Sequence, residues 1–220
     1  MRIALAWAGA GLAIGVAGLV IDASLIFPSM SVVSATNPVA RSFPDTFVYF
    51  WTYFTHLTNL WLVVCYLAYI TEWRWLSLFR RSTMQASAAA FITLVMLFYH
   101  FMLAPYLEMQ GALEVATYML HYVAPVMYLA WWAFGAPHGR LTWGSVPLIL
   151  LPGVIYVAWV LLRGAVVNEY PYDILDAGKN GYGGVAIGVL ILLVAVAIFA
   201  ALLVGTDKLI ARRRTRAPAA

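Results

Sequence analysis

Five side chains suited to catalysis lie within the long apolar runs of this 220-residue chain. Thr55, His56 and Asn59 fall in the second run, His100 falls in the third, and His121 falls in the fourth. Polar groups inside a bilayer are costly unless they meet a partner or water, so each is a candidate functional residue. An alcohol beside an imidazole is the pair that nucleophilic hydrolysis requires, because the imidazole takes the proton of the alcohol as it attacks a carbonyl carbon.

Thr55 and His121 are the pair that we expect to carry this chemistry, as nucleophile and general base. At a rise of about 1.5 Å per helical residue, Thr55 lies about 12 Å below the external surface, and His100 and His121 each lie about 9 Å below it. In this shared layer a low dielectric favours the neutral imidazole, which can accept a proton. Supporting roles, in orienting the base, stabilising the oxyanion or binding substrate, are open to Asn59, His56, His100, Asp22, Tyr99, Tyr122 and Arg163.

These residues also have other interpretations. Helical spacing predicts one polar stripe along the second run, made of Thr52, Thr55, His56 and Asn59. Threonine and asparagine often join helices, and buried histidines are often hydrogen-bonded within a core. The three histidines with Asp22 nearby leave open a zinc site, and His100 with His121 leaves open haem ligation, although we predict no metal or cofactor. The sequence contains no Gly-x-Ser-x-Gly elbow, no His-Glu-x-x-His pair and no phosphate-binding loop.

Apolar runs long enough to cross a bilayer must position these groups. Hydrophobic residues make up 64% of the chain and charged residues 10%, which excludes an ordinary soluble domain. At about 20 residues per crossing, the sequence predicts an all-α, polytopic membrane protein with six transmembrane helices. The predicted spans are Ile3–Phe27, Phe47–Thr71, Ala86–Tyr106, Val115–Phe134, Val146–Leu162 and Tyr182–Gly205.

The basic residues predict how these spans are oriented. Arg41, Arg163 and Lys179 fall on one side of them, and the other ten of the 13 Lys and Arg residues fall on the opposite side. Because cytoplasmic loops are enriched in Lys and Arg, we expect both termini in the cytoplasm. The net charge of +4 is then a topology signal and implies no nucleic-acid partner. We expect one six-helix domain over 1–206 and a basic cytoplasmic tail over 207–220.

Three separated pieces of the sequence carry a family resemblance. Residues 54–59 read Phe-Thr-His-Leu-Thr-Asn, residues 121–125 read His-Tyr-Val-Ala-Pro, and residues 170–173 read Tyr-Pro-Tyr-Asp. Together they resemble the bacterial branch of the androgen-induced and androgen-dependent-TFPI-regulating family of membrane proteins. The resemblance implies a six-helix integral membrane protein and, as in vertebrate members, an intramembrane threonine hydrolase of fatty acid esters of hydroxy fatty acids. It maps the nucleophile and the histidine of that family to Thr55 and His121.

Our prediction is therefore a lipid ester hydrolase of the bacterial cytoplasmic membrane that takes its substrate from the bilayer. An alternative is a non-enzymatic protein that binds or carries a lipid or small solute, with Asp22, His100 and His121 as recognition or proton-coupling groups. A third hypothesis is a zinc-dependent lipid hydrolase that uses the intramembrane histidines. Arg163, at the external end of the fifth span, is expected to pair with an anionic lipid group or to extend to the interface.

Overall fold

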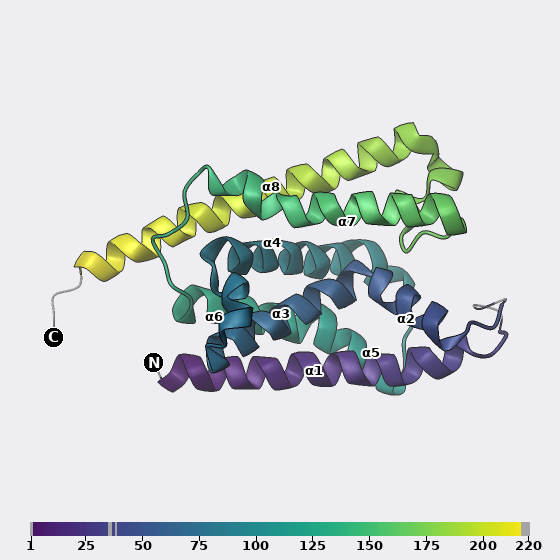
Figure 1. Ribbon diagram of the computed structural model, residues 1–220, viewed down its shortest axis with the longest axis horizontal. Helices are drawn as coiled ribbons and strands as arrows, with labels where there is room; N and C mark the ends of the chain where they lie inside the picture. The colour runs from purple at the N-terminus through teal and green to yellow at the C-terminus, as the bar shows by residue number, and fades with distance from the viewer. Residues whose placement is uncertain (1, 35–36, 38, 217–220) are drawn as a thin grey trace.

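The computed structural model describes residues 2–34, 37 and 39–216, and this part of the chain is helical, with no β-strand. The long helices run along the length of the molecule, with α1 at the bottom and α7 and α8 at the top of Figure 1. One π-helical turn, Tyr99–Leu103, follows α4. A second, Met119–Val123, joins α5 to α6. The helices are α1 (Arg2–Met30), α2 (Phe43–Thr52), α3 (Phe54–Thr71), α4 (Ser82–Phe98), α5 (Gly111–Tyr118), α6 (Ala124–Gly135), α7 (Ser145–Val167) and α8 (Ala177–Arg216), with short 3-10 segments at Arg74–Arg80, Ala104–Tyr106 and Asp173–Leu175.

Within the described residues, five helical segments are long and apolar enough to cross a membrane. Large apolar side chains on their surfaces are exposed, among them Val20, Leu162 and Leu190. Such a surface is unfavourable in water but is expected in contact with lipid. These properties are those of an integral membrane protein. The five segments are Arg2–Met30, Phe54–Thr71, Ser82–Tyr106, Ser145–Val167 and Ala177–Arg214.

Two of the predicted spans are not single α-helices. The prediction of one continuous helix over Phe47–Thr71 is wrong, because α2 ends at Thr52, Tyr53 is extended with ψ at 128°, and α3 begins at Phe54. The span predicted over Val115–Phe134 corresponds to α5, a π turn and α6, which together cover residues 111–135. Both irregularities lie beside the side chains for which the sequence predicts chemistry.

Distant side chains support the break between α2 and α3. Residues 50–56 contain no glycine or proline, so the local sequence does not explain it. Two tyrosines satisfy the backbone groups that the break exposes: the Tyr156 hydroxyl donates to the Thr52 carbonyl at 2.9 Å, and the Tyr172 hydroxyl accepts from the Phe54 N–H at 3.0 Å. Backbone polar groups at membrane depth require such partners, so the break is part of the tertiary structure.

The π turns have a local cause. A proline stands two residues beyond each of them, Pro105 in one case and Pro125 in the other. Because proline has no N–H, the carbonyl four residues earlier, that of His121 in the second turn, loses its α-helical donor. The Ala124 N–H instead binds the Met119 carbonyl, five residues earlier. The helix is therefore widened at the turn that carries His121.

Helix α4 lies at the centre of the packing and contacts α3, α6, α7 and α8. Its residues Ala86, Ala88, Ala89 and Ala90 are fully buried. Small side chains let neighbouring helices approach closely, which is how helices associate where both surfaces are apolar. This core holds α3 against α6. It thereby fixes the first turn of α3 relative to the π turn Met119–Val123, which precedes α6.

The C-terminal helix is longer than the sequence predicts. Because α8 continues to Arg216, the predicted boundary between a domain ending at 206 and a tail starting at 207 lies inside a helix. Residues 217–220 of the predicted tail lie outside the described residues. The buried Asp207 accepts hydrogen bonds from the Gly139 N–H at 2.9 Å, the Leu141 N–H at 3.0 Å and His138 Nδ1 at 3.1 Å. Its carboxylate therefore joins the loop after α6 to α8.

An ion-pair cluster holds the connection after α7. Glu169 binds the guanidinium groups of Arg41 and Arg163, the latter at 2.6 Å. Burial acts to raise the pKa of Glu169, but the hydrogen bonds and charges of the two arginines outweigh it and hold the pKa below its ordinary value. The contribution of this cluster to stability is therefore present above the ordinary glutamate pKa and is lost as the pH falls through the lowered one.

We expect the melting temperature of the detergent-solubilised protein to fall as the pH is lowered from the ordinary glutamate pKa through the lowered pKa of Glu169. The fall should be steeper for the wild type than for Glu169→Gln, which has no carboxylate at this position to protonate. Asp173→Asn is the matched control, because Asp173 pairs with Lys179 but is largely exposed. The same acid dependence in wild type and Glu169→Gln would contradict the prediction.

Candidate active site

The structure brings Thr55 and His121 together. The Thr55 Oγ1 and His121 Nε2 atoms are 3.5 Å apart, at the long limit of a hydrogen bond. Thr55 is the second residue of α3, and His121 is the middle residue of the second π turn. Hydrogen bonds between catalytic groups are often long before substrate binds, so this separation suits a nucleophile and its base.

The second ring nitrogen of His121 determines the role of the first. His121 Nδ1 lies 2.9 Å from the Thr117 carbonyl oxygen, which can only accept, so Nδ1 carries the proton. In the neutral ring Nε2 then presents its lone pair to the Thr55 hydroxyl. The imidazole also stacks on the Tyr99 ring, with centroids 4.0 Å apart. These contacts fix the orientation of the ring, with Nε2 toward Thr55.

Asn59 links the two segments that carry this pair. Its Nδ2 atom donates to the Thr55 carbonyl at 2.9 Å and to the Leu120 carbonyl at 3.1 Å. The side chain is fully buried. One amide therefore joins the backbone of Thr55 to the backbone of the residue before His121. Asn59 acts through these two backbones, so we assign it a positioning role.

Tyr172 provides a hydrogen-bond donor beside Thr55. The first N–H groups of a helix have no acceptor within the helix, and that of Phe54 donates to the Tyr172 hydroxyl at 3.0 Å. Tyr172 and Thr55 line the same cavities. A phenol that accepts one hydrogen bond still has its own proton to donate. Tyr172 is thus placed to donate to a carbonyl oxygen held next to Thr55.

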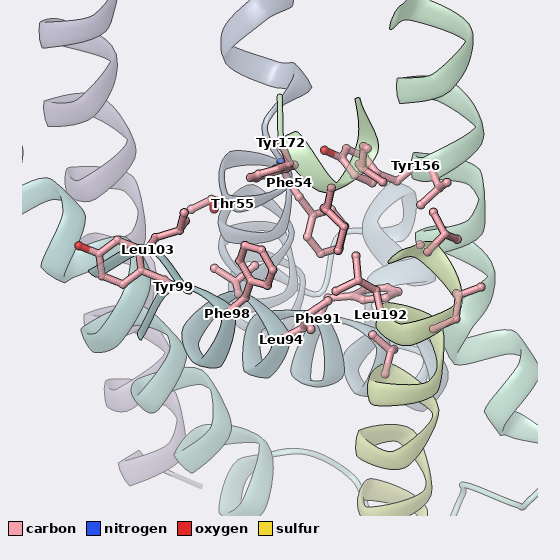
Figure 2. Close-up of a pocket in the computed structure, with 18 of the residues that line it drawn as sticks. Phe54, Thr55, Phe91, Leu94, Phe98, Tyr99, Leu103, Tyr156, Tyr172 and Leu192 are labelled. Atoms are coloured by element: carbon pink, nitrogen blue, oxygen red, sulfur yellow. The ribbon is translucent and has the colours of Figure 1, made fainter. Parts of the chain in front are cut away.

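A cavity lined by hydrophobic side chains, called here the apolar cavity, extends from Thr55 among α4, α7 and α8. Figure 2 shows Thr55 and Tyr99 at one end of it and Leu192 at the other, with the rings of Phe91 and Phe98 along the wall. Its lining contains few polar atoms. The cavity therefore has the chemistry of a site for a hydrocarbon chain.

A second cavity, called here the mixed cavity, opens from the same pair toward α1. Thr55 and His121 line it together with Asp22, His56 and apolar side chains such as Ile26. The two candidate catalytic groups therefore stand where the apolar and the mixed cavities meet.

His56 and Asp22 form a buried pair that lines the mixed cavity. His56 Nε2 lies 2.7 Å from Asp22 Oδ2, and His56 Nδ1 lies 2.6 Å from the Phe50 carbonyl oxygen. The imidazole stacks on the Phe50 ring, with centroids 3.8 Å apart. Neither residue is hydrogen-bonded to Thr55 or His121, so they do not orient the His121 ring.

The other predicted residues lie apart from Thr55. His100 is exposed, and its Nδ1 lies 3.1 Å from the Tyr122 hydroxyl. Arg163 binds Glu169, as described above. Neither the apolar nor the mixed cavity is lined by His100, Tyr122 or Arg163.

The predicted polar stripe is interrupted. Thr52 belongs to α2, where its hydroxyl donates to the Val48 carbonyl at 2.6 Å, so including it in one stripe with Asn59 is wrong. The helical phase is lost at the break between α2 and α3.

The histidines also do not converge: in residues 2–34, 37 and 39–216, no three His, Cys, Asp or Glu side chains are grouped so that they could hold a metal ion.

Three contributors to the site were not predicted. They are the Tyr172 hydroxyl, the Phe54 N–H and the Thr117 carbonyl. Two of them are backbone groups, whose role depends on where a helix begins or widens and not on residue type. For Tyr172 the available signal was the Tyr-Pro-Tyr-Asp piece at 170–173, which the family resemblance includes.

Comparison with known proteins gives no significant match to a family model, to a curated protein or to a solved structure.

Proposed function

We propose that this protein is an intramembrane threonine hydrolase that cleaves lipid esters. The observation that carries the proposal is the Thr55 hydroxyl, 3.5 Å from His121 Nε2 at the end of an apolar cavity. Because the Thr117 carbonyl holds the proton of His121 on Nδ1, Nε2 is the acceptor that an alcohol nucleophile requires. An acyl chain can enter such a cavity and remain in apolar surroundings.

In the first half-reaction the Thr55 oxygen attacks the ester carbonyl carbon, and the proton of Thr55 passes to His121 Nε2. The carbonyl electron pair moves onto its oxygen, which becomes an oxyanion. When that pair returns, the bond between the carbon and the alcohol oxygen breaks, and the leaving oxygen takes the proton from Nε2. The products are the released alcohol and an acyl group esterified to Thr55.

In the second half-reaction water resolves the acyl-enzyme. His121 Nε2 takes a proton from water, whose oxygen attacks the same carbonyl carbon. The bond between that carbon and the Thr55 oxygen then breaks, and the Thr55 oxygen receives the proton from Nε2. The fatty acid leaves, and the hydroxyl and the neutral imidazole are restored.

Tyr172 is the group that we assign to the oxyanion. Its hydroxyl lies at the N-terminal turn of α3, next to Thr55, and is held by the Phe54 N–H. The N-terminal end of a helix also favours negative charge through its partial positive charge. A donor fixed before the reaction stabilises the developing charge without reorganisation.

The membrane arrangement belongs to the same proposal. We propose six spans, with α5, the second π turn and α6 forming the fourth, and both termini in the cytoplasm of a bacterial cell. The N-terminal end of α1 and the C-terminal end of α8 at one end of the molecule support an even number of crossings (Figure 1). The excess of Lys and Arg predicted for that side supports the orientation. The resemblance to the androgen-induced family agrees with this arrangement.

Labelling with a fluorophosphonate probe tests the proposal directly. The purified protein is incubated with the probe, and the adduct is located by mass spectrometry. We expect phosphonylation of Thr55 that depends on His121. No adduct at Thr55, together with solute transport that survives Thr55→Ala, would favour the binding protein or carrier instead.

Asn59→Leu tests the positioning role of Asn59. We expect kcat to fall by about tenfold to a hundredfold, because loss of the amide lets the backbones of Thr55 and Leu120 separate by fractions of an ångström. Probe labelling of Thr55 should slow in parallel, whereas KM should change little. Thr58→Ala, a buried position on the same helix, is the control. A normal labelling rate in Asn59→Leu would contradict the assignment.

A further inference from the structure

The apolar and mixed cavities meet at the Thr55–His121 pair. A carbonyl carbon held at Thr55 carries two different substituents, the acyl chain and the alcohol oxygen. Each substituent can therefore enter its own cavity, and the lining determines which one enters which. The residues that line both cavities are Thr55, Tyr99, Leu103, His121 and Tyr172.

The apolar cavity suits the acyl chain. Apart from the residues shared with the mixed cavity, it is lined by hydrophobic side chains, Gly153 and Tyr156. The Tyr156 hydroxyl already donates to the Thr52 carbonyl. Figure 2 shows the Phe91 ring along the wall and Leu192 on the side away from Thr55. A hydrocarbon chain in this space leaves no polar group without a partner, whereas a group with several hydroxyls would find, beyond the residues shared with the mixed cavity, only the Tyr156 oxygen as a side-chain acceptor.

The mixed cavity suits an alcohol that carries further hydroxyl groups. It is lined by Asp22, His56, Tyr49 and Tyr53, and the two tyrosine hydroxyls lie 2.6 Å apart. Within the described residues only His56 binds the Asp22 carboxylate, through Oδ2, so Asp22 Oδ1 is available as an acceptor. Hydroxyl groups can donate to that oxygen and exchange hydrogen bonds with the phenols.

The charges around this space disfavour an anionic alcohol. An adjoining outer cavity, which shares Met109 with the mixed one, is lined by Glu108 and Glu114. Among the described residues that line these two cavities there is no Lys or Arg. Arg41 stacks on the Tyr49 ring at 4.4 Å, but its guanidinium is bound by Glu169. Both ring nitrogens of His56 are already bound, one by the Asp22 carboxylate and the other by the Phe50 carbonyl, so an anion would lose hydration here without gaining a free counter-charge.

We propose that the acyl chain occupies the apolar cavity, that the alcohol part occupies the mixed cavity, and that this alcohol is a neutral, hydroxyl-bearing group of the glycerol type. The inference rests on the proposed hydrolysis at Thr55. It differs from what the family resemblance implies, since an ester of a hydroxy fatty acid carries a carboxylate on its alcohol part.

Three esters of oleic acid separate these possibilities: 1-oleoylglycerol, the oleate ester of a hydroxystearic acid, and the methyl ester of that same compound. We expect kcat/KM for the glycerol ester to exceed that for the free acid by at least about tenfold, because the acid carries an unpaired charge into the site. Methylation should recover most of the difference. A free acid that is cleaved as fast as its methyl ester, or faster, would overturn the inference.

Leu192→Trp tests the location of the acyl chain. A larger side chain at the far end of the apolar cavity should lower kcat/KM for 1-oleoylglycerol by at least about tenfold and leave 1-butanoylglycerol nearly unchanged, because a short chain does not reach Leu192. Leu190→Trp is the matched control, because Leu190 lies on the same helix and is exposed at its surface. Equal losses for both substrates in Leu192→Trp would place the chain elsewhere.

The same assays distinguish failure of the proposed hydrolysis from failure of the assignment of the alcohol. If no ester is cleaved, or if cleavage is unchanged in Thr55→Ala, the hydrolase proposal fails and this inference fails with it. If cleavage depends on Thr55 but the free acid is preferred, only the assignment of the alcohol fails. Loss of that preference in Arg41→Gln would then identify Arg41 as the carboxylate-binding residue.

Discussion

Replacing Thr55 with alanine is expected to lower kcat for ester hydrolysis by at least about 10³-fold, because the substitution removes the atom that forms the acyl-enzyme in the proposed mechanism. The fluorophosphonate adduct should disappear as well. Thr55→Ser keeps the hydroxyl and should retain measurable turnover and labelling. The melting temperature should change little, because Thr55 is only partly buried and its hydrogen bond to His121 is long.

Thr58→Ala is the matched control for that substitution. Thr58 is a fully buried threonine on the same helix, and it lines neither the apolar nor the mixed cavity. Turnover and labelling should therefore remain close to those of the wild type. Equal turnover in Thr55→Ala and Thr58→Ala would show that the hydroxyl of Thr55 is not the nucleophile.

Tyr172→Phe is expected to lower kcat by about 10²- to 10³-fold and to leave KM within a few fold of the wild type. The phenyl ring fills the same space between the two cavities, so substrate should still bind. The donor to the oxyanion is lost, and this donor acts only when negative charge develops. Steady-state kinetics with 1-oleoylglycerol would measure both parameters.

Tyr156→Phe separates catalysis from structure in this experiment. Both tyrosines satisfy a backbone group at the break between α2 and α3, through the Phe54 N–H for Tyr172 and the Thr52 carbonyl for Tyr156. Both variants should therefore lose a similar amount of thermal stability, whereas only Tyr172→Phe should lose most of its kcat. Parallel losses of kcat and stability in the two variants would mean that Tyr172 has a structural role alone.

The sequence predicted the elements of the fold better than their irregularities. Apolar length and composition are sufficient to identify α1, α4, α7 and α8, because a membrane span is defined by those two properties. The break at Tyr53 has no local signal, since it is held by tyrosines more than 100 residues away along the chain. The second π turn could have been suspected from Pro125, which removes a donor from the helix.

For the site, the sequence predicted that Thr55 and His121 lie at a similar depth in the membrane. In the structure the Thr55 Oγ1 and His121 Nε2 atoms are 3.5 Å apart. Depth alone could not predict rotation about each helix axis. His100 has the same predicted depth as His121, but it is exposed and bound to Tyr122 instead of facing Thr55. Asp22 was near enough in depth to be a candidate, but its partner is His56.

The π turn at Met119–Val123 has a consequence for how such a site can arise. A π turn holds one more residue than the α-helical turn that it replaces, so it is equivalent to a single-residue insertion into an ordinary helix. Each added residue rotates the helix on its N-terminal side by about 100° relative to the helix on its C-terminal side. Without the extra residue, the same packing of α6 would direct the imidazole of His121 away from Thr55. The one extra residue in this turn is therefore what sets the direction in which His121 faces, independently of how α6 packs.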